Sequence, residues 1–374
     1  MKVLHISKYY PPVLGGIESV AWELVEGANA AGVRTDVLCS HQRPVTAREQ
    51  APAGYHITRA ATAGTWLSTS MAPALVWELR RQQSRYDLIH VHMPDPMAAA
   101  AIWLNRPAAP LVVHWHSDVI RKRLALQLYE PLQTWLLERA AAIVATSPPY
   151  AASSPPLSRW QHKVHVIPIG ISDRAGQACS DRAAEIRSRF AGRRLVFALG
   201  RMTYYKGFDV LIEAVSRLPE QVGLMIGGEG ELLGRMQRLV DRKGLGERVQ
   251  LLGHVPDDHL ASYFEACDVF CMSSTVRSEA YGVAMLEAMM MGKPVVATDI
   301  AGSGVPWVNQ HALTGLNVPA GDADALADAL WRLLSSTDLL EIYGQRARER
   351  YSREFAAGRM VERTLGLYRE LVKA

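Results

Sequence analysis

Short apolar runs of strand length alternate with helical patterns along nearly the whole chain, and this alternation limits the possible folds more than any other feature. The runs are apolar at consecutive positions, which is typical of parallel strands covered by helices on both faces. They form two series of six, at residues 3–6, 35–39, 87–92, 111–116, 142–146 and 164–167, and at residues 195–199, 223–226, 249–252, 269–272, 294–298 and 315–318. We therefore predict an α/β protein made of two doubly wound domains.

The two series also indicate where one domain ends. A chain of 374 residues is longer than one ordinary core requires. After residues 168–173 the sequence becomes polar and charged up to Arg194, so we place the domains at residues 1–170 and 171–354. Residues 355–371 carry apolar side chains at helical spacing. We expect this last segment, residues 355–374, to form a helix that packs back on the first domain.

The composition describes a soluble globular protein, because 49% of the residues are hydrophobic and 21% are charged. No run reaches the roughly 18 consecutive apolar residues of a membrane span, and the N-terminal apolar run is too short for a signal peptide. We therefore expect a cytoplasmic protein. The net charge is +4, and residues 1–170 hold 16 Lys and Arg against 11 Asp and Glu. This weak bias favours an anionic lipid surface or a phosphorylated acceptor and does not indicate nucleic acid.

Neither the cysteines nor the histidines predict a metal site. The scattered cysteines are expected to be reduced, buried packing residues: Cys39, Cys179, Cys267 and Cys271. Two H-x-H pairs end predicted strands, and residues i and i+2 share a strand face, so a metal cluster is conceivable. No Cys or H-E-x-x-H pattern accompanies them, however. We expect His116, the last before a loop, to face a ligand. Packing or supporting roles are expected for the others: His5, His90, His92 and His114.

Residues 278–299 contain a short turn of small residues between two acids, Glu279 and Glu287, followed by a helix and a buried strand. The start of a helix favours an anionic ligand, because its N–H groups are unpaired and its dipole is positive there. Acids on both sides of such a site suit hydroxyl groups instead. A ligand with phosphates in its middle and sugars at both ends meets both demands. The alternative is that Glu279 only complements the helix dipole and Glu287 is a solvated helix position.

Two further loops follow predicted strands, where open α/β sheets bind ligands. Gly15 and Gly16 allow the backbone to approach a phosphate closely, although a plain turn before a helix is the alternative. Arg201 and Lys206 are able to converge on one diphosphate and neutralise it without a metal. Solvated surface charge is the alternative for this pair. Neither loop has the G-x-G-x-x-G pattern of a nicotinamide site.

A basic stretch, Arg121, Lys122 and Arg123, precedes amphipathic residues that are interrupted by Pro131. This pattern suits peripheral contact with the cytoplasmic face of the inner membrane. Ordinary packing of a bent helix is an equal alternative.

Together these motifs resemble those of the retaining GT-B glycosyltransferases of family 4. The resemblance covers essentially the whole chain in the right order, and it rests on Gly15-Gly16, His116, Gly200-Arg201, Lys206-Gly207 and the E-x7-E pair Glu279 and Glu287. It implies two Rossmann-like domains that face across a cleft holding a nucleotide-diphosphate sugar. It implies neither a metal nor another cofactor.

The resemblance also implies roles for the donor-binding residues. Glu279 binds hydroxyls of the transferred sugar, and Glu287 holds the ribose of the nucleotide. The phosphates are capped by the backbone of Ala280, Tyr281, Gly282 and Val283.

The remaining roles concern the reaction itself. Arg201 and Lys206 stabilise the departing diphosphate, and His116 contacts the donor sugar near the reacting carbon. Transfer with retention proceeds on one face of the sugar, and the leaving phosphate accepts the proton of the acceptor hydroxyl. Because Glu279 follows a predicted strand in a loop, we expect Glu279→Ala to abolish transfer and leave the fold intact.

Residues 301–307 depart from the family pattern, in which two glycines are followed by an acid, so no contact is carried over for this loop. With the preceding Glu279 turn, residues 304–310 look most like bacterial enzymes that build O-antigen or exopolysaccharide on a lipid carrier. This resemblance implies a lipid-linked saccharide acceptor and, as first choice, GDP-mannose as donor. Alternatives are UDP-glucose, UDP-GlcNAc or GDP-rhamnose, a nucleotide-sugar epimerase or hydrolase, and, least favoured, a non-catalytic sugar-nucleotide-binding scaffold.

Overall fold

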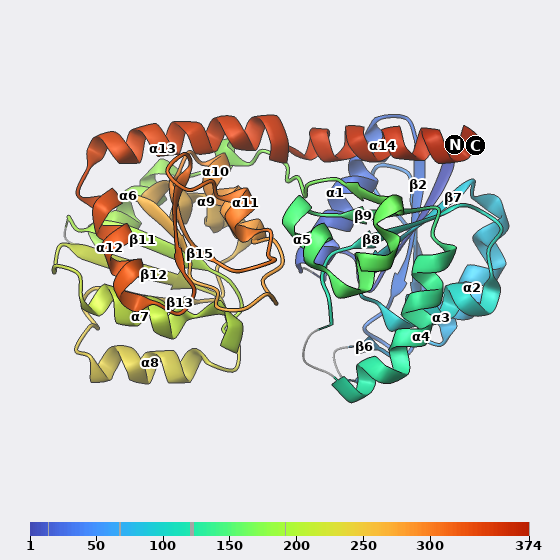
Figure 1. Cartoon of the computed structure of the whole chain (residues 1–374), viewed down its shortest axis with the longest axis horizontal. Coiled ribbons are helices and arrows are strands. Elements are labelled where there is room, and N and C mark those ends of the chain that lie inside the picture. Colours follow the sequence, from blue (N-terminus) through green and yellow to red (C-terminus); the bar gives the residue numbers. More distant parts are fainter. Residues whose placement is uncertain (14, 67–68, 120–122, 191, 374) are drawn as a thin grey trace. The chain divides into compact units, whose positions relative to one another are not determined.

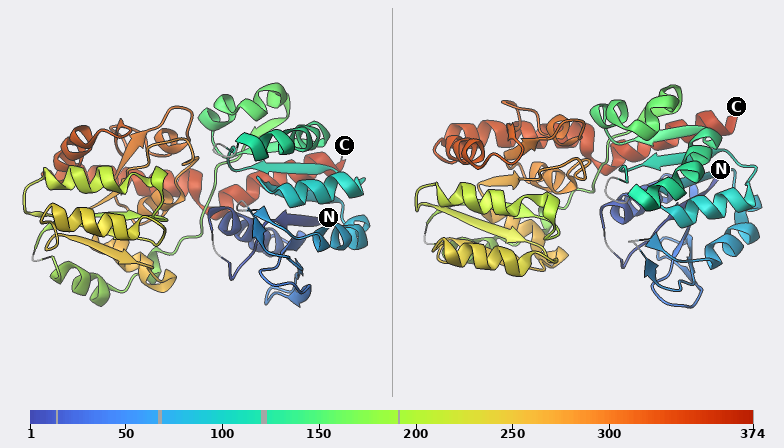
Figure 2. Two further views of the ribbon diagram at one scale, coloured as in Figure 1. Left: turned by 90° about the horizontal axis from the view of Figure 1, so that it is seen from below. Right: turned by 60° about the horizontal axis from the view of Figure 1, so that its bottom comes forward.

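The computed structural model describes residues 1–13, 15–66, 69–119, 123–190 and 192–373. Its contacts divide the chain into two compact units. Unit 1 comprises Met1–Ser172 together with the residues from Ala357 onward, and unit 2 comprises Asp173–Ala356. Each unit has one main sheet with helices on both faces (Figures 1 and 2). The chain leaves unit 1 beside the boundary expected at residue 170.

Unit 1 is built on an eight-stranded sheet with the strand order β10-β9-β8-β7-β1-β2-β4-β3. Every pairing is parallel except that of β3 with β4. The six apolar runs predicted for this part of the chain all form strands: β1 (Lys2–Ser7), β2 (Arg34–Ser40), β7 (Leu88–Met93), β8 (Leu111–Trp115), β9 (Ala142–Ala145) and β10 (Val164–Val166).

Four short strands of unit 1 were not predicted: β3 (Ala47–Gln50), β4 (His56–Ala60), β5 (Thr65–Trp66) and β6 (Thr69–Ser70). β3 is largely exposed at the edge of the sheet, and β4 beside it has polar residues at His56, Thr58 and Arg59. β5 and β6 form a separate two-stranded sheet. None of these short strands has the continuous apolar run from which the other strands were predicted.

The helices of unit 1 are α1 (Gly16–Ala30), α2 (Ala74–Gln82), α3 (Pro96–Asn105), α4 (Arg123–Arg139), α5 (Pro148–Ser153) and α14 (Ala357–Lys373), with 3-10 turns η1 (Gln83–Arg85) and η2 (Pro155–Lys163). α14 lies against α1. Gly27 of α1 permits this close approach, since a Cβ there would lie 2.4 Å from Cγ2 of Val361. The helix expected at the end of the chain therefore packs on unit 1.

Unit 2 is built on a six-stranded, fully parallel sheet with the order β13-β12-β11-β14-β15-β16. All six strands were predicted: β11 (Arg194–Leu199), β12 (Val222–Gly227), β13 (Val249–Gly253), β14 (Val269–Met272), β15 (Val295–Asp299) and β16 (Gly315–Pro319). Their helices are α6 (Ser180–Ser188), α7 (Phe208–Ser216), α8 (Leu233–Arg242), α9 (Asp257–Ala266), α10 (Val283–Met290), α11 (Val305–Val308), α12 (Ala323–Leu334) and α13 (Thr337–Arg350). Shorter turns are η3 (Ala175–Gln177), η4 (Tyr204–Lys206) and the π-helical η5 (Tyr351–Phe355).

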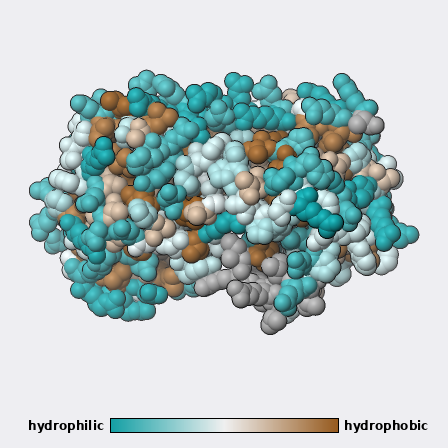
Figure 3. Space-filling model, in the orientation of Figure 1, coloured by the Kyte–Doolittle hydropathy of each residue, from teal (hydrophilic) through white to brown (hydrophobic). Residues whose placement is uncertain are grey.

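Hydrophilic residues cover much of the face seen in Figure 3, and hydrophobic residues are scattered between them. Within the described ranges, no helix has both the length and the apolar character needed to cross a bilayer. The cysteines are free thiols, and three of them are buried. The expectation that all four are buried is wrong for Cys179, which lies on the surface just before α6.

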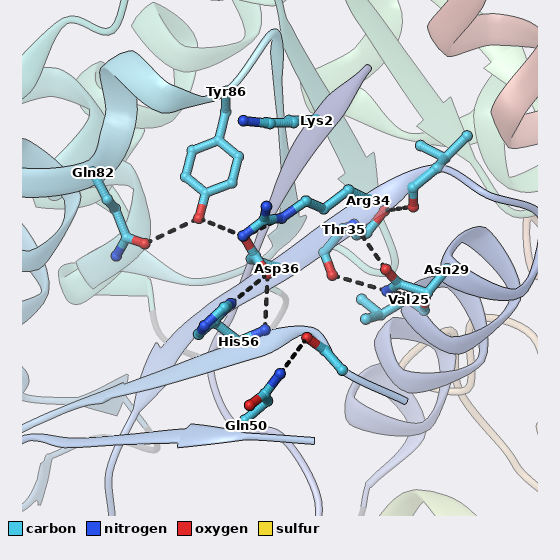
Figure 4. Close-up of polar contacts among 12 residues, drawn as sticks. Lys2, Val25, Asn29, Arg34, Thr35, Asp36, Gln50, His56, Gln82 and Tyr86 are labelled. Carbon is cyan, nitrogen blue, oxygen red and sulfur yellow. Dashed lines mark hydrogen bonds and ion pairs between the residues drawn. The ribbon is translucent and has the colours of Figure 1, made fainter. Parts of the chain in front are cut away.

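Polar contacts hold the start of β2 to its neighbours (Figure 4). Asp36 accepts hydrogen bonds from the backbone N–H of His56 at 2.8 Å and from the Tyr86 hydroxyl at 3.0 Å. The Asn29 side chain joins α1 to both backbone groups of Thr35. This edge lies at the opposite ends of the strands from the loops predicted to bind a ligand, and its carboxylate is engaged within the unit.

Candidate functional site

Two glycines of unit 2 place the side chain of Lys206 beyond the end of β11. Gly200 has a φ of +153°, and a Cβ there would lie 2.8 Å from Cε of Lys206. Gly207 has a φ of +62°, and a Cβ there would lie 2.1 Å from the carbonyl oxygen of Ser273. Both positions therefore favour glycine for conformation and for space. The spacing of Gly200 and Gly207 around Lys206 allows η4 to form and directs the lysine side chain along the end of the sheet.

Lys206 and Glu279 form a nearly buried ion pair. The ammonium nitrogen lies 2.6 Å from Oε2 of Glu279, and each side chain is 11% exposed. The Ser274 hydroxyl donates a second hydrogen bond to the same oxygen at 3.0 Å. Burial is the largest single effect and lowers the pKa of Lys206, but the charges of Glu279 and Tyr205 and the hydrogen bond to Glu279 together outweigh it, so the net shift of the pKa is upward. The ammonium is therefore charged and faces a charged carboxylate in a site largely screened from water.

This pairing bears on the expectation that Glu279→Ala leaves the fold intact, which stays a prediction. Glu279 lies in the loop between β14 and α10, as expected, and its carboxylate is buried against Lys206. Removing one partner of such a pair leaves the other charge buried without a counter-ion. Arg201 is exposed, and its charge lies close enough to lower the pKa of Lys206.

The turn after Glu279 leads into α10 through Gly282, whose φ of +85° is left-handed. Among the described residues, no side chain caps this helix start. A second loop braces the turn, since the Ser303 hydroxyl donates to the carbonyl oxygen of Glu279 at 2.5 Å and the Gly304 N–H donates to that of Ala280 at 2.8 Å. The departure from the family pattern at residues 301–307 thus contributes direct support to the Glu279 turn.

The backbone positions predicted to cap phosphates are Ala280, Tyr281, Gly282 and Val283. The first three are buried, and Val283 is partly exposed at the start of α10. The ring of Tyr281 packs edge-on against Phe355. The Tyr281 side chain therefore packs against η5, and the backbone of the turn stays the predicted ligand contact.

Glu287 lies one turn along α10 and is half-buried. Burial raises the pKa of its carboxyl to about 7; Arg174 counteracts that rise, and Asp257 adds to it. This is not the environment of a solvated helix residue. At neutral pH the group is divided between its charged and neutral forms, as is common at functional sites.

In unit 1 the two early glycines begin α1. Gly15 is extended and Gly16 is the first helical residue. The carboxylate of Glu18 folds back over Gly15, where a Cβ would lie 2.4 Å from Oε2. Burial raises the pKa of Glu18, while its own backbone N–H and the charge of Lys8 act in the opposite direction. Glycine at position 15 therefore makes room for a partly buried acid in the first turn of α1.

A nearby acid, Asp95, was not singled out from the sequence. It caps α3, accepting from the N–H groups of Met97 and Ala98 through Oδ1, while the buried Oδ2 has no hydrogen-bond partner among the described residues. Burial raises its pKa to about 6 despite those two hydrogen bonds. The sequence does contain a signal for the helix cap, because Asp followed by Pro is typical of a helix start. That pattern does not indicate that the Asp95 carboxylate is buried.

The histidines of unit 1 come together on three adjacent strands. The aligned registers place His5 opposite His90 and His92 opposite His114, and His116 follows at the end of β8. All five are buried, and His116 is 6% exposed. Packing or supporting roles were expected for His5, His90, His92 and His114, and their ring nitrogens are in fact hydrogen-bonded to one another or to His116.

These histidines include two groups of three whose nitrogens are close enough to suggest a metal: His5, His90 and His92, and His92, His114 and His116. Their ring planes do not suit one. His5 stacks on His90 at 4.4 Å and 8°, and His114 on His116 at 4.1 Å and 12°. An imidazole nitrogen binds a metal in the plane of its ring, and stacked parallel rings do not direct their lone pairs at one point.

The loop after β8 fixes the position of His116. The Asp118 carboxylate accepts from the Trp115 indole at 2.9 Å and from the Ser154 hydroxyl at 2.7 Å. The basic stretch that begins soon afterwards is only partly visible, since Arg121 and Lys122 lie outside the described residues. Arg123 begins α4, which continues through Pro131 as one helix.

Two family models match the chain. Residues 15–170 match the glycosyl transferase 4-like domain, and residues 181–350 match glycosyl transferases group 1. The chain is 32% identical over 380 residues to O-antigen chain mannosyltransferase C of Escherichia coli, covering 100% of both proteins. It is also 32% identical over 360 residues to D-rhamnosyltransferase WbpZ of Pseudomonas aeruginosa, covering 96% of this chain and 93% of that one.

Solved structures share the fold. Sucrose-phosphate synthase of Thermosynechococcus elongatus matches with a TM-score of 0.83 and 24% identity, over 99% of this chain and 98% of that one. Anabaena HepE in complex with UDP-glucose matches with a TM-score of 0.80 and 23% identity, over 99% and 100%. The chain therefore belongs to the group 1 glycosyl transferases, retaining enzymes of family 4 with the GT-B fold.

Proposed function

We propose that this glycosyltransferase moves mannose from GDP-mannose to a lipid-linked saccharide during O-antigen or exopolysaccharide synthesis. The observation that carries the proposal is the end-to-end similarity to O-antigen chain mannosyltransferase C, which spans both proteins completely at 32% identity. Such coverage includes both units and every loop of the candidate site.

The Lys206–Glu279 pair supplies two complementary functions for a nucleotide sugar. An ammonium group has three N–H donors, and Glu279 occupies one of them, so the others are available to a diphosphate oxygen. The carboxylate has further lone pairs for hydroxyl groups of the transferred sugar. Arg201 adds a second, exposed cation for the leaving diphosphate. Charges arranged before the reaction stabilise the charge that develops on the leaving group.

The remaining donor contacts lie along α10. The backbone from Ala280 to Val283 presents the uncapped helix start to phosphate oxygens, where the helix dipole favours negative charge. Glu287, one turn later, accepts hydrogen bonds from the ribose hydroxyls in its ionised form. Half-burial makes that contact strong, and it also makes it dependent on pH.

Unit 1 contributes His116, which we assign to the transferred sugar near the reacting carbon, and the backbone at Gly15 and Gly16. The acceptor hydroxyl attacks the anomeric carbon as the bond to the diphosphate oxygen breaks. Its proton goes to that phosphate oxygen, so that charge and protons balance without a protein base. The configuration of the anomeric carbon is retained because both events occur on one face.

A donor panel tests the proposal. GDP-mannose, GDP-rhamnose, UDP-glucose and UDP-GlcNAc are each incubated with the protein and a lipid-linked saccharide, and release of GDP or UDP is measured with the anomeric configuration of the product. We expect GDP release from GDP-mannose that depends on the acceptor, with an α-linked product. Absence of turnover with every donor refutes the function. Free sugar released without acceptor indicates a hydrolase instead.

GDP-rhamnose is the second candidate donor, and a specific observation supports it. The chain is as similar to D-rhamnosyltransferase WbpZ as to the mannosyltransferase, at 32% identity over nearly the whole of both. Faster turnover with GDP-rhamnose than with GDP-mannose would select this alternative.

A further inference from the structure

Six buried side chains of unit 1 form one hydrogen-bonded group, here called the histidine network: His5, His90, His92, His114, His116 and Tyr368. Five come from β1, β7 and the end of β8, which lie side by side in the sheet. The sixth comes from α14, at the far end of the sequence. The mechanism proposed above uses only His116, and the other five have no assigned role.

The Tyr368 hydroxyl is the centre from which two branches start. It lies 2.9 Å from Nε2 of His5 and 2.6 Å from Nδ1 of His90. In the first branch, Nδ1 of His5 lies 3.1 Å from Nε2 of His92, and Nδ1 of His92 lies 2.9 Å from Nε2 of His116. This branch ends at Nδ1 of His116, which has no hydrogen-bond partner among the described residues.

The second branch is shorter. Nε2 of His90 lies 3.2 Å from Nδ1 of His114. It ends at Nε2 of His114, which is buried and has no partner within the described ranges. Both branches therefore end on the same segment of chain, His114 at the end of β8 and His116 just beyond it, with the two rings stacked.

All five imidazoles are neutral, because burial lowers the pKa of each of them below its usual value. A neutral imidazole has one N–H donor and one bare acceptor nitrogen, and a phenol has one donor. Each hydrogen bond in a branch must pair a donor with an acceptor. The proton position on one ring therefore fixes the position on the next, and the Tyr368 hydroxyl connects the two branches.

Only two arrangements satisfy every bond and also use the buried Tyr368 O–H as a donor. If Tyr368 donates to His90 and accepts from His5, every ring carries its proton on Nε2, and His116 offers a bare Nδ1. If Tyr368 donates to His5 and accepts from His90, every ring carries its proton on Nδ1, and His116 offers an N–H. The five histidines thus share one tautomer, and His116 is either an acceptor or a donor at its free end.

We propose that Tyr368 is a positioning residue that, through the histidine network, sets which form of His116 faces the substrate. The proposal rests on the proposed contact of His116 with the transferred sugar. The other histidines transmit the choice without touching the ligand. Because the two arrangements have equal numbers of internal hydrogen bonds, a substrate hydroxyl or ring oxygen at His116 decides between them at little cost.

The tautomers are directly measurable by nitrogen NMR on full-length protein labelled with 15N-histidine, since protonated and bare ring nitrogens have well-separated shifts. Substitution of single histidines assigns the signals. We expect the five network rings to share one tautomer or one averaged shift pattern in the wild-type protein. Mixed tautomers, or a doubly protonated ring at neutral pH, would overturn the proposal without any measurement of activity.

Tyr368→Phe tests control by the hydroxyl. We expect the Nδ1 signal of His116 to move, although the substituted side chain does not touch that ring. Tyr55→Phe is the matched control, because it removes a buried tyrosine hydroxyl of unit 1 that bonds to Tyr10 and Glu26 instead. An unmoved His116 signal in Tyr368→Phe, or an equal movement in Tyr55→Phe, would refute the assignment.

Turnover provides the link to function. Without the Tyr368 hydroxyl, the form of His116 that the reaction requires is only partly populated, and only that fraction of the enzyme is active. Tyr368→Phe should therefore reduce kcat about two- to tenfold. The affinity for GDP should be unchanged, because GDP lacks the sugar that His116 contacts. If the His116 signal moves and kcat is unchanged, the network controls the His116 tautomer but His116 does not contact the sugar. Failure of the proposed sugar contact can thus be told apart from failure of the network.

Discussion

The Lys206–Glu279 pair should be strongly coupled in stability, and a double-mutant cycle measures this. The change is Lys206→Met, Glu279→Leu and the two together, which replace each charged side chain by an apolar one of similar size. The atoms in contact are 2.6 Å apart, and each side chain is 11% exposed. Little water is therefore available to solvate a charge that loses its partner.

Removing one member of a fully buried pair costs about 3–5 kcal/mol. The residual exposure leaves some solvation, so we expect each single variant to lose about 2–4 kcal/mol. Glu279→Leu should lose more, because the Ser274 hydroxyl also loses its acceptor, at about 1 kcal/mol. The double variant leaves no buried charge without its partner, and it should be more stable than either single variant.

Hydrogen exchange of the amides in β11 and β14 gives the free energy of unfolding of unit 2 specifically, at equal pH for all four proteins. The control cycle is Arg189 with Glu185, an exposed pair on or beside α6 in the same unit. Its coupling should be below about 0.5 kcal/mol. If the losses at Lys206 and Glu279 simply add in the double variant, the two charges do not depend on one another and the reasoning fails.

Two further predictions concern other parts of the chain. Glu287 has a folded pKa of about 7, above its ordinary value of 4.5, so the wild-type protein should lose stability as the pH rises through that interval, by about 1–3 kcal/mol after allowance for partial exposure. Glu287→Gln should remove this loss in urea unfolding from pH 4 to pH 8, and an unchanged pH dependence would contradict the assigned burial. Gly27→Ala should cost about 1–3 kcal/mol by forcing α14 away from α1. Adding Val361→Ala should recover most of that loss in thermal unfolding, whereas an additive loss would show that the helices do not meet there.

The strands were predictable because burial on both faces demands continuous apolar residues, as in β7 and β14. Edge strands such as β3 do not require continuous apolar residues, so the apolar pattern did not predict them. The acids and glycines of the site were visible because they follow predicted strands. The partnership of Lys206 with Glu279 was not, since 73 residues separate them and only the strand order of the folded sheet brings them together.

The histidine network was less predictable still. Alternate positions on β7 and β8 were known to share a face, but the alignment of His5 with His90 depends on strand register. The contribution of Tyr368 depends on a helix more than 270 residues away in sequence. Local patterns identify which residues are able to take part, and the long-range pairing determines how they are connected.

The position of α14 has a consequence for synthesis on the ribosome. Its apolar residues cover α1, which is made near the beginning of the chain. The surface of α1 that α14 covers therefore stays exposed while the whole of unit 2 is translated. It is covered only when residues 357–373 have emerged from the ribosome. Chaperone binding to nascent chains should accordingly persist past the completion of unit 2 and end with the release of this helix.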